Sequence, residues 1–354
     1  MAVTLEDLLR KAVEVGASDL HIEENCQPAL RVQGKIAFLD TEPLSEEDVA
    51  DMILPIMSEE DYETYITMGD VDFAYSFPNL SRFRVNALNH YNGRGAVFRV
   101  IPNEIPTLEG LGLPTVLETV AGFDKGLVLV TGPTGCGKST TLAAILRYIN
   151  DTRTDHIITV EDPIEFIHPA GKAFIEQREF GRHTHSFADA LKASLRESPD
   201  VVMIGEMRDL ETISQALRAA ETGHLILATL HTSSVTQTLA RIVDVFPPDE
   251  QPQIRSLLSG SLRAIVCQQL LPNTRGGRVA AMEIMLMNGS MAGIIREGKT
   301  SQIRSFLMMG RAEGMQTMDL HLAHLVHNRE ISMDTAADYC TDFELIKHHD
   351  ELFC

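Results

Sequence analysis

Apolar and polar positions follow two different patterns in this chain of 354 residues, one before and one after residue 115. In the later part, short apolar runs alternate with longer segments of helical periodicity, which is typical of a mainly parallel sheet with helical crossovers. The predicted strands are 127–130, 156–160, 201–204, 225–230 and 279–287. The predicted helices are 140–150, 187–197, 210–222 and 253–271. The pattern therefore predicts an α/β domain.

Residues 1–102 have a different pattern, which predicts a smaller α+β domain. Thr4, Ser45 and Ser58 are each followed three residues later by an aspartate. This spacing is a capping signal, so each of the three residues is expected to start a helix. Residues 29–39 read as a hairpin of two short strands.

Prolines and glycines concentrate after residue 101, where they predict an inter-domain linker. The resulting division has an N-terminal domain at 1–102, a linker at 103–114, a main α/β domain at 115–288 and a C-terminal helical region at 289–354.

Composition narrows the class of protein. Acids outnumber Lys and Arg 50 to 30, giving a formal net charge of −20, and this disfavours nucleic acid as the main partner. The five cysteines are scattered without a C-x-x-C pair, which fits a reducing cytosol. No stretch approaches the roughly 18 apolar residues of a membrane span, and Glu6 and Asp7 do not suit a signal peptide. We therefore expect a cytoplasmic protein with no membrane span of its own.

Residues 132–139 match the phosphate-binding pattern G-x-x-x-x-G-K-[ST] and lie between a predicted strand and a predicted helix. Backbone N–H groups of such a loop surround a phosphate, Lys138 can reach the β- and γ-phosphates, and Ser139 can ligate Mg²⁺. ATP and Mg²⁺ are therefore the expected ligands. The nucleotide-binding candidates are Gly132, Pro133, Thr134, Gly135, Cys136, Gly137, Lys138, Ser139 and Thr140.

Carboxylates and imidazoles follow or flank several of the other predicted strands. Glu165 ends a group of three acids after 156–160, Glu206 follows 201–204, and His224 and His231 bracket 225–230. Phosphoanhydride hydrolysis needs groups that orient water, hold a metal ion and sense the γ-phosphate. These residues favour a working ATPase over a protein that only binds nucleotide.

The sequence pattern leaves the role of two arginines in the N-terminal domain open. Arg84 lies on the polar face of the alternating segment 82–87, and Arg99 lies on the next predicted strand. Arginines on surface strands commonly protect a sheet edge, and they also stabilise phosphoryl charge.

Four segments resemble named motifs of one family. Residues 132–142, 159–166, 205–212 and 220–232 look like the Walker A, Asp, Walker B and His boxes of the type II/IV secretion ATPases. Within that superfamily the chain resembles the type IV pilus retraction ATPases, the branch of PilT and its paralogue PilU. The resemblance extends over essentially the whole chain and implies a RecA-like P-loop core, a PAS-like N-terminal domain and C-terminal helices.

The same resemblance implies a role for each candidate. Lys138 and Ser139 would bind triphosphate and Mg²⁺, Glu165 would be the catalytic glutamate that polarises water, and Glu206 would act at the metal, directly or through water. His224 and His231 would contact or sense the γ-phosphate.

The arginines and the partners also follow from the resemblance. Subunits would form a homohexamer in which Arg84 and Arg99 complete a neighbour's nucleotide site. ATP hydrolysis would drive domain rotation, delivered to an inner-membrane pilus platform protein to depolymerise pilin in twitching motility. The protein would thus be cytoplasmic and peripheral to the inner membrane.

Two departures from the family pattern leave alternative functions open. Cys136 stands where a serine is expected, and only Ile295-Arg296-Glu297 survives of a box that retraction ATPases carry in their C-terminal region. An accessory PilU-like motor or a related secretion ATPase is the first alternative. A nucleotide-binding regulatory or scaffold subunit and a nucleic-acid translocase are the others.

Overall fold

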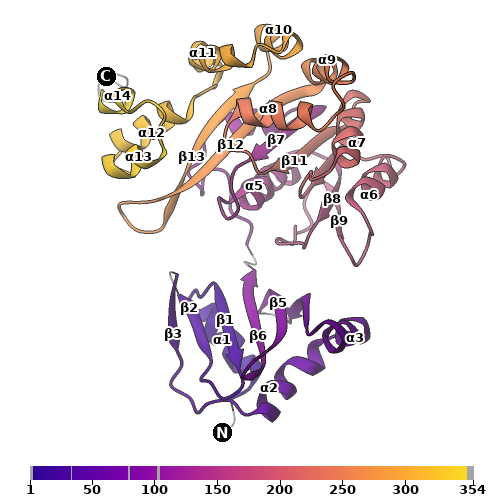
Figure 1. Cartoon of the computed structure of the whole chain (residues 1–354), viewed down its shortest axis with the longest axis vertical. Coiled ribbons are helices and arrows are strands. Elements are labelled where there is room, and N and C mark those ends of the chain that lie inside the picture. Colours follow the sequence, from indigo (N-terminus) through magenta and orange to yellow (C-terminus); the bar gives the residue numbers. More distant parts are fainter. Residues whose placement is uncertain (1–2, 33, 79, 102–103, 349–354) are drawn as a thin grey trace. The chain divides into compact units, whose positions relative to one another are not determined.

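A computed structural model of the chain describes residues 3–32, 34–78, 80–101 and 104–348. It divides into two compact units, Met1–Glu104 and Ile105–Cys354 (Figure 1). Pro102, the last residue of the predicted N-terminal domain, and Asn103, the first residue of the predicted linker, lie outside the described residues.

Over its described residues, the first unit is an antiparallel sheet with three α-helices. Its strand order is β3-β2-β1-β6-β5-β4. The strands are β1 Asp19–Glu23, β2 Ala29–Val32, β3 Lys35–Phe38, β4 Asp70–Phe77, β5 Ser81–His90 and β6 Gly93–Ile101. The helices are α1 Leu5–Glu14, α2 Glu46–Ile53 and α3 Glu59–Met68, with a 3-10 turn, η1, at Leu54–Ile56.

Local signals in the sequence correctly placed several of these elements. Thr4, Ser45 and Ser58 cap α1, α2 and α3, and each forms a reciprocal capping box with its aspartate. Strands β2 and β3 form the predicted hairpin. Along β5, Phe83, Val85 and Ala87 are buried, while the alternating residues Arg82, Arg84 and Asn86 are half-buried. The predicted one-sided strand is confirmed.

The second unit contains a seven-stranded sheet in the order β13-β12-β7-β11-β10-β8-β9. All neighbouring strands run parallel except β12 and β13. The strands are β7 Gly126–Thr131, β8 His156–Glu161, β9 Phe174–Glu179, β10 Val201–Ile204, β11 Leu225–Leu230, β12 Leu262–Pro272 and β13 Arg278–Leu286. The α/β fold class is confirmed.

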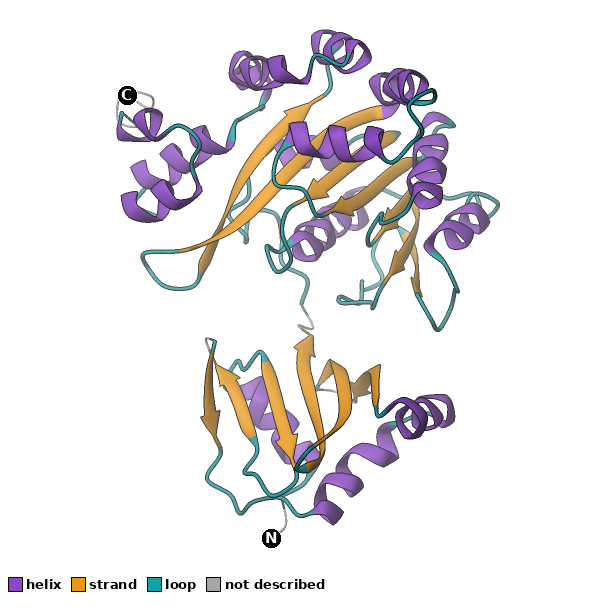
Figure 2. Ribbon diagram, in the orientation of Figure 1, coloured by secondary structure: helices purple, strands orange, loops and turns teal. Residues whose placement is uncertain are grey.

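Helices cover both faces of this sheet (Figure 2). They are α4 Val116–Ala121, α5 Lys138–Thr152, α6 Phe187–Ser194, α7 Leu210–Glu221, α8 Val235–Asp244, α9 Gln251–Ser261 and α10 Gly289–Glu297. The chain continues through η2 Thr300–Gln302, α11 Ile303–Met309, η3 Gly310–Glu313, α12 Met318–His327, α13 Met333–Tyr339 and α14 Phe343–Lys347. Among the described residues, none of these helices combines the length and the apolar character that crossing a bilayer requires.

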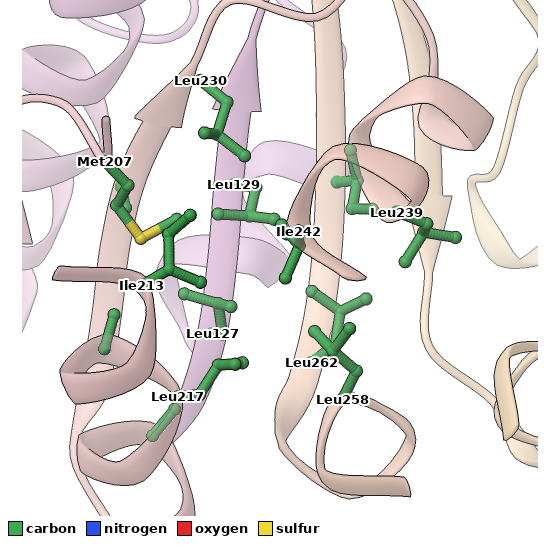
Figure 3. Close-up of a cluster of buried hydrophobic side chains, with 14 of the residues drawn as sticks. Leu127, Leu129, Met207, Ile213, Leu217, Leu230, Leu239, Ile242, Leu258 and Leu262 are labelled. Atoms are coloured by element: carbon green, nitrogen blue, oxygen red, sulfur yellow. The ribbon is translucent and has the colours of Figure 1, made fainter. Parts of the chain in front are cut away.

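Strand β7 lies in the middle of the core, with every residue buried. Leu127 and Leu129 pack against α7 and α8 on one face, beside Ile213 and Ile242 (Figure 3). The intervening valines of β7 pack with α4 and α5 on the other face. Because successive side chains alternate across a strand, a strand buried on both faces reads as a continuous apolar run. This rigid strand leads directly into residues 132–139.

Two predictions differ from the structure. The predicted helix 253–271 ends at Ser261, and its second half is strand β12, which pairs with β7 and β13. An apolar run has no period that separates a buried strand from a helix, so its neighbours decide. Residues 105–114 of the predicted linker belong to the second unit, where Leu108 and Leu113 are buried in the core.

Candidate active site

The register of the parallel strands brings four chain segments to one edge of the second sheet. Thr131 at the end of β7 pairs with Leu230 of β11, and Ile204 of β10 pairs with both Ala228 of β11 and Val160 of β8. The segments that follow β7, β8, β10 and β11 therefore leave the sheet on the same side. In open α/β sheets this carboxyl edge is where ligands bind.

Residues 132–139 form a loop that requires glycine at two points. Gly132 has φ +147 and lies so close to Gln268 of β12 that a Cβ would collide with the Gln268 carbonyl oxygen. Gly137 has φ +88 and caps the start of α5. Both φ values are unfavourable for residues with a Cβ. The loop therefore places the free N–H groups of the first turn of α5 at the sheet edge, where they favour anions.

Lys138 is held above this loop. Its Nζ donates to the carbonyl oxygens of Gly132, at 2.9 Å, and Pro133, at 3.1 Å. The same Nζ lies 3.4 Å from Nδ1 of His231, which follows β11. Thr134, Gly135 and Ser139 are exposed and Thr140 is half-buried, so the loop presents its tip and the Ser139 hydroxyl outward.

Cys136 points into the protein, away from the exposed tip. Its side chain is 3% exposed, and burial raises the pKa of its thiol. Since the thiolate is the form that reacts, this environment disfavours oxidation of Cys136.

A glutamine that the sequence analysis missed braces the loop. The Gln268 amide donates to the Cys136 carbonyl oxygen and accepts from the Thr141 hydroxyl of α5 at 2.7 Å. Gln268 is 3% exposed. Its side chain therefore links the loop to the first turn of α5 within the core.

Replacing this brace should destabilise the protein. Gln268→Leu leaves the Cys136 carbonyl and the Thr141 hydroxyl without their buried partner, which costs about 1–3 kcal/mol for such a group. We expect that loss in urea unfolding, together with weaker binding of a fluorescent ATP analogue. Gln269→Leu, at the next position of β12, is the matched control; equal losses in the two variants would contradict a specific bracing role.

His231 connects the loop to the segment after β10. Its Nε2 lies 3.0 Å from Oε1 of Glu206, and Oε2 of Glu206 accepts from Arg208 at 2.8 Å. Burial alone would raise the pKa of the Glu206 carboxyl, but Arg208 and His231 outweigh it and the pKa is lowered. Lys138, His231, Glu206 and Arg208 thus form a continuous polar chain across the sheet edge.

Glu165 lies on the loop after β8, between two anchored neighbours. Ile164 and Phe166 are buried while Glu165 is exposed. Phe166 packs with Ala143 of α5, the helix that begins at the phosphate-binding loop. The apolar neighbours therefore fix this acidic residue to the same part of the unit and leave its carboxylate accessible.

The structure does not bring His224 to this edge. Its carbonyl accepts from the N–H of Gly126, the first residue of β7, at 2.9 Å. Its Nδ1 lies 3.1 Å from the Ala219 carbonyl oxygen at the end of α7. Strand β11 spans roughly 20 Å at about 3.3 Å per residue, so it separates His224 from His231. The structure therefore places His231, but not His224, beside Lys138, and the role of either histidine at the γ-phosphate stays a prediction.

Arg84 and Arg99 lie directly opposite each other on β5 and β6 of the first unit. Arg84 Nε is 3.5 Å from Oδ1 of Asp72, and Arg99 Nε donates to Oδ1 of Asp19 at 3.0 Å. The Arg99 side chain is 66% exposed, whereas that of Asp19 is 7% exposed. A buried carboxylate thus orients an accessible guanidinium, and the role of the two arginines at a nucleotide stays a prediction.

Comparison with known proteins decides the family. A model of the type II/IV secretion system proteins matches residues 1–341. This chain belongs to that family. It is 46% identical over 334 residues to the type IV pilus retraction ATPase PilT of Pseudomonas aeruginosa, covering 94% of this chain and 97% of that protein. It is 42% identical over 345 residues to the type IV pilus ATPase PilU of the same organism, covering 96% and 90%.

A solved structure supports the same family assignment. The crystal structure of the pilus retraction motor PilT with bound ADP superposes with a TM-score of 0.91 at 43% identity, covering 96% of this chain and 98% of that one. The chain is therefore a PilT-like, ATP-hydrolysing member of the type II/IV secretion system family, and the predicted family and nucleotide binding are confirmed.

Family motifs account for part of the observed site. Arg208 stands two residues after Glu206 inside the motif 205–212, so its position was available in the sequence although its ion pair was not. No motif in the sequence pointed to Gln268, and its segment was predicted as helix.

Proposed function

We propose that this protein is a motor that converts ATP hydrolysis into retraction of a type IV pilus. The observation that carries the proposal is the polar chain from Lys138 through His231 to Glu206, which joins three separate motifs at one sheet edge. The similarity to PilT over nearly the whole of both chains supports the same reading.

Triphosphate binding follows from the loop. N–H groups at the start of α5 would hold the phosphates, and Lys138 would exchange its carbonyl partners for β- and γ-phosphate oxygens. Ser139 and Glu206 fit Mg²⁺, because an exposed hydroxyl and a carboxylate are hard oxygen donors. When bound, the ion would neutralise charge on the phosphates.

Water activation belongs to Glu165 in this proposal. Its exposed carboxylate would accept a hydrogen bond from the attacking water and orient it toward the γ-phosphorus. His231 would respond to the loss of the γ-phosphate, since one of its nitrogens faces Lys138 and the other faces Glu206, the groups that would contact nucleotide and metal in this proposal.

Assembly of several subunits would bring further positive charge to each nucleotide site. We propose a homohexamer in which Arg84 and Arg99 reach the nucleotide of a neighbouring subunit, so that hydrolysis and domain rotation are coupled. The motor would lie in the cytoplasm, held at the inner membrane by a pilus platform protein, and its rotation would depolymerise pilin.

Phosphate release tests the enzymatic part. The purified protein should hydrolyse ATP in the presence of Mg²⁺, and Glu165→Ala should lower the rate by two or more orders of magnitude while ATP still binds, because a group acting on water in the transition state contributes about 10²–10⁴-fold. Equal turnover by both proteins would refute the role of Glu165. Binding without turnover by either protein would favour a regulatory subunit.

A deletion strain tests the cellular part. Loss of the gene should abolish twitching and leave assembled surface pili that no longer retract. The accessory PilU-like function is the second candidate, favoured by 42% identity to PilU over nearly the whole chain. Retraction that persists in the deletion strain, and fails only under load or only when a second motor is also removed, would identify that accessory role.

A further inference from the structure

Strand β9, which the sequence did not reveal, holds the loop that carries Glu165. This strand lies at the edge of the sheet and pairs in parallel with β8, so that Thr159 faces Gln177 and Glu161 faces Glu179. The chain between the two strands must therefore leave β8 and return beside it. Side chains of β9 reach back to the polypeptide backbone of this connection.

Gln177 makes three hydrogen bonds there. Its Nε2 donates to the carbonyl oxygen of Phe166 at 2.9 Å and to Oε1 of Glu161 at 3.0 Å. Its Oε1 accepts from the N–H of His168 at 3.0 Å. Both amide hydrogens and the amide oxygen are thus used. A reversed amide would place its oxygen against a carbonyl and a carboxylate, so only one orientation satisfies the network.

The other side of Glu165 is fixed in the same way. The N–H of Ile164 donates to Oε2 of Glu179 at 3.1 Å, and Glu179 is 4% exposed. Peptide groups of both residues adjacent to Glu165 are therefore bonded to β9.

Glu161 completes the support beneath the loop. It is 8% exposed, and burial raises the pKa of its carboxyl, while hydrogen bonds from the Thr159 hydroxyl, the Gln177 amide and the Glu165 backbone oppose that shift. The Thr159 hydroxyl donates to Oε1 at 2.6 Å. The Glu165 backbone bonds this buried carboxylate directly, and Gln177 links the same carboxylate to Phe166 and His168 on the far side of Glu165.

We propose that Gln177 is a positioning residue for ATP hydrolysis, acting through Glu165. This inference rests on the proposed function, in which Glu165 orients water. The Gln177 side chain makes no hydrogen bond to the phosphate-binding loop among the described contacts, so its loss should displace the carboxylate and leave the phosphate contacts intact. A displacement of about 1 Å at a reacting group can lower a rate by about 10²-fold.

The principal variant is Gln177→Met, which keeps the length of the side chain and removes all three hydrogen bonds. We expect kcat to fall about 10- to 100-fold, with the Kd of a fluorescent ATP analogue within about twofold of wild type. Gln177→Glu keeps the size and the acceptor for His168 but removes both donors, and it should lose activity likewise. Glu176→Gln is the matched control. Glu176 is the preceding residue of β9, its side chain is exposed, and its Oε2 lies 3.0 Å from Nε2 of His156.

A double-mutant cycle separates positioning from general damage. If Gln177 acts through Glu165, then Gln177→Met should cause little further loss in single-turnover hydrolysis by Glu165→Gln. Multiplied losses would overturn the proposal, as would full activity of Gln177→Met or a matching rise in the Kd for ATP. Full turnover by Glu165→Gln alone would instead refute the catalytic role of Glu165, so the two failures are distinguishable.

Discussion

Replacing Lys138 with alanine should abolish ATP hydrolysis and weaken ATP binding. Lys138 Nζ already lies within hydrogen-bond distance of two loop carbonyls and of His231, which places an ammonium group where the phosphates would bind. Removing one partner of a close charge pair costs about 2–5 kcal/mol. At about 1.4 kcal/mol per tenfold, that corresponds to a rise in Kd of roughly 30- to several-thousand-fold.

The measurement is titration with a fluorescent ATP analogue beside phosphate release. Lys172→Ala removes an exposed lysine elsewhere in the second unit and should leave both quantities unchanged. Lys138→Arg keeps the charge but replaces a compact ammonium with a planar fork, and we expect partial binding with little turnover. Undiminished hydrolysis by Lys138→Ala would exclude the loop from the active site.

Arg99→Ala and Arg84→Ala should each lower kcat strongly. An arginine that meets the developing charge on a transferred phosphoryl group contributes about 10³–10⁵ in rate in related chemistry. Asp19 holds Arg99 from a buried position and leaves its guanidinium exposed, as a residue that acts on a neighbouring subunit requires. The folded state of each variant should be close to wild type, because neither arginine is part of the core.

Mixing variants tests action between subunits. Arg99→Ala combined with Glu165→Ala should recover activity, because a site with intact Glu165 can receive an intact arginine from the other variant. Arg31→Ala is the control, since Arg31 also approaches Asp19, at 3.6 Å, without being a predicted finger. Proven co-assembly with no recovered activity would count against both arginines.

Residue spacing predicted much of the local structure. The capping boxes at Thr4, Ser45 and Ser58 start helices because a side-chain oxygen and a backbone N–H three residues away are enough to form them. The loop before α5 was predicted for the same reason, since its glycines and Lys138 act within eight consecutive residues. The apolar runs also predicted five strands of the main domain, which are β7, β8, β10, β11 and β13, but not β9 or β12.

Contacts between distant segments decided the features that residue spacing did not predict. The run that forms β12 is mostly apolar, and pairing with β7 and β13 makes it a strand that brings Gln268 under the loop. His224 and His231 both flank β11, yet the direction of that strand places only His231 beside Lys138.

The sequence by itself determined the family and the phosphate-binding loop, and it supplied most of the candidate reacting groups, because each is encoded in a short contiguous motif. Only the tertiary structure decided which of those groups meet and what holds them, through strand direction, register and the edge strand β9. The physical reason is that a motif fixes the conformation of its own few residues, whereas the distance between two motifs depends on how the whole sheet packs.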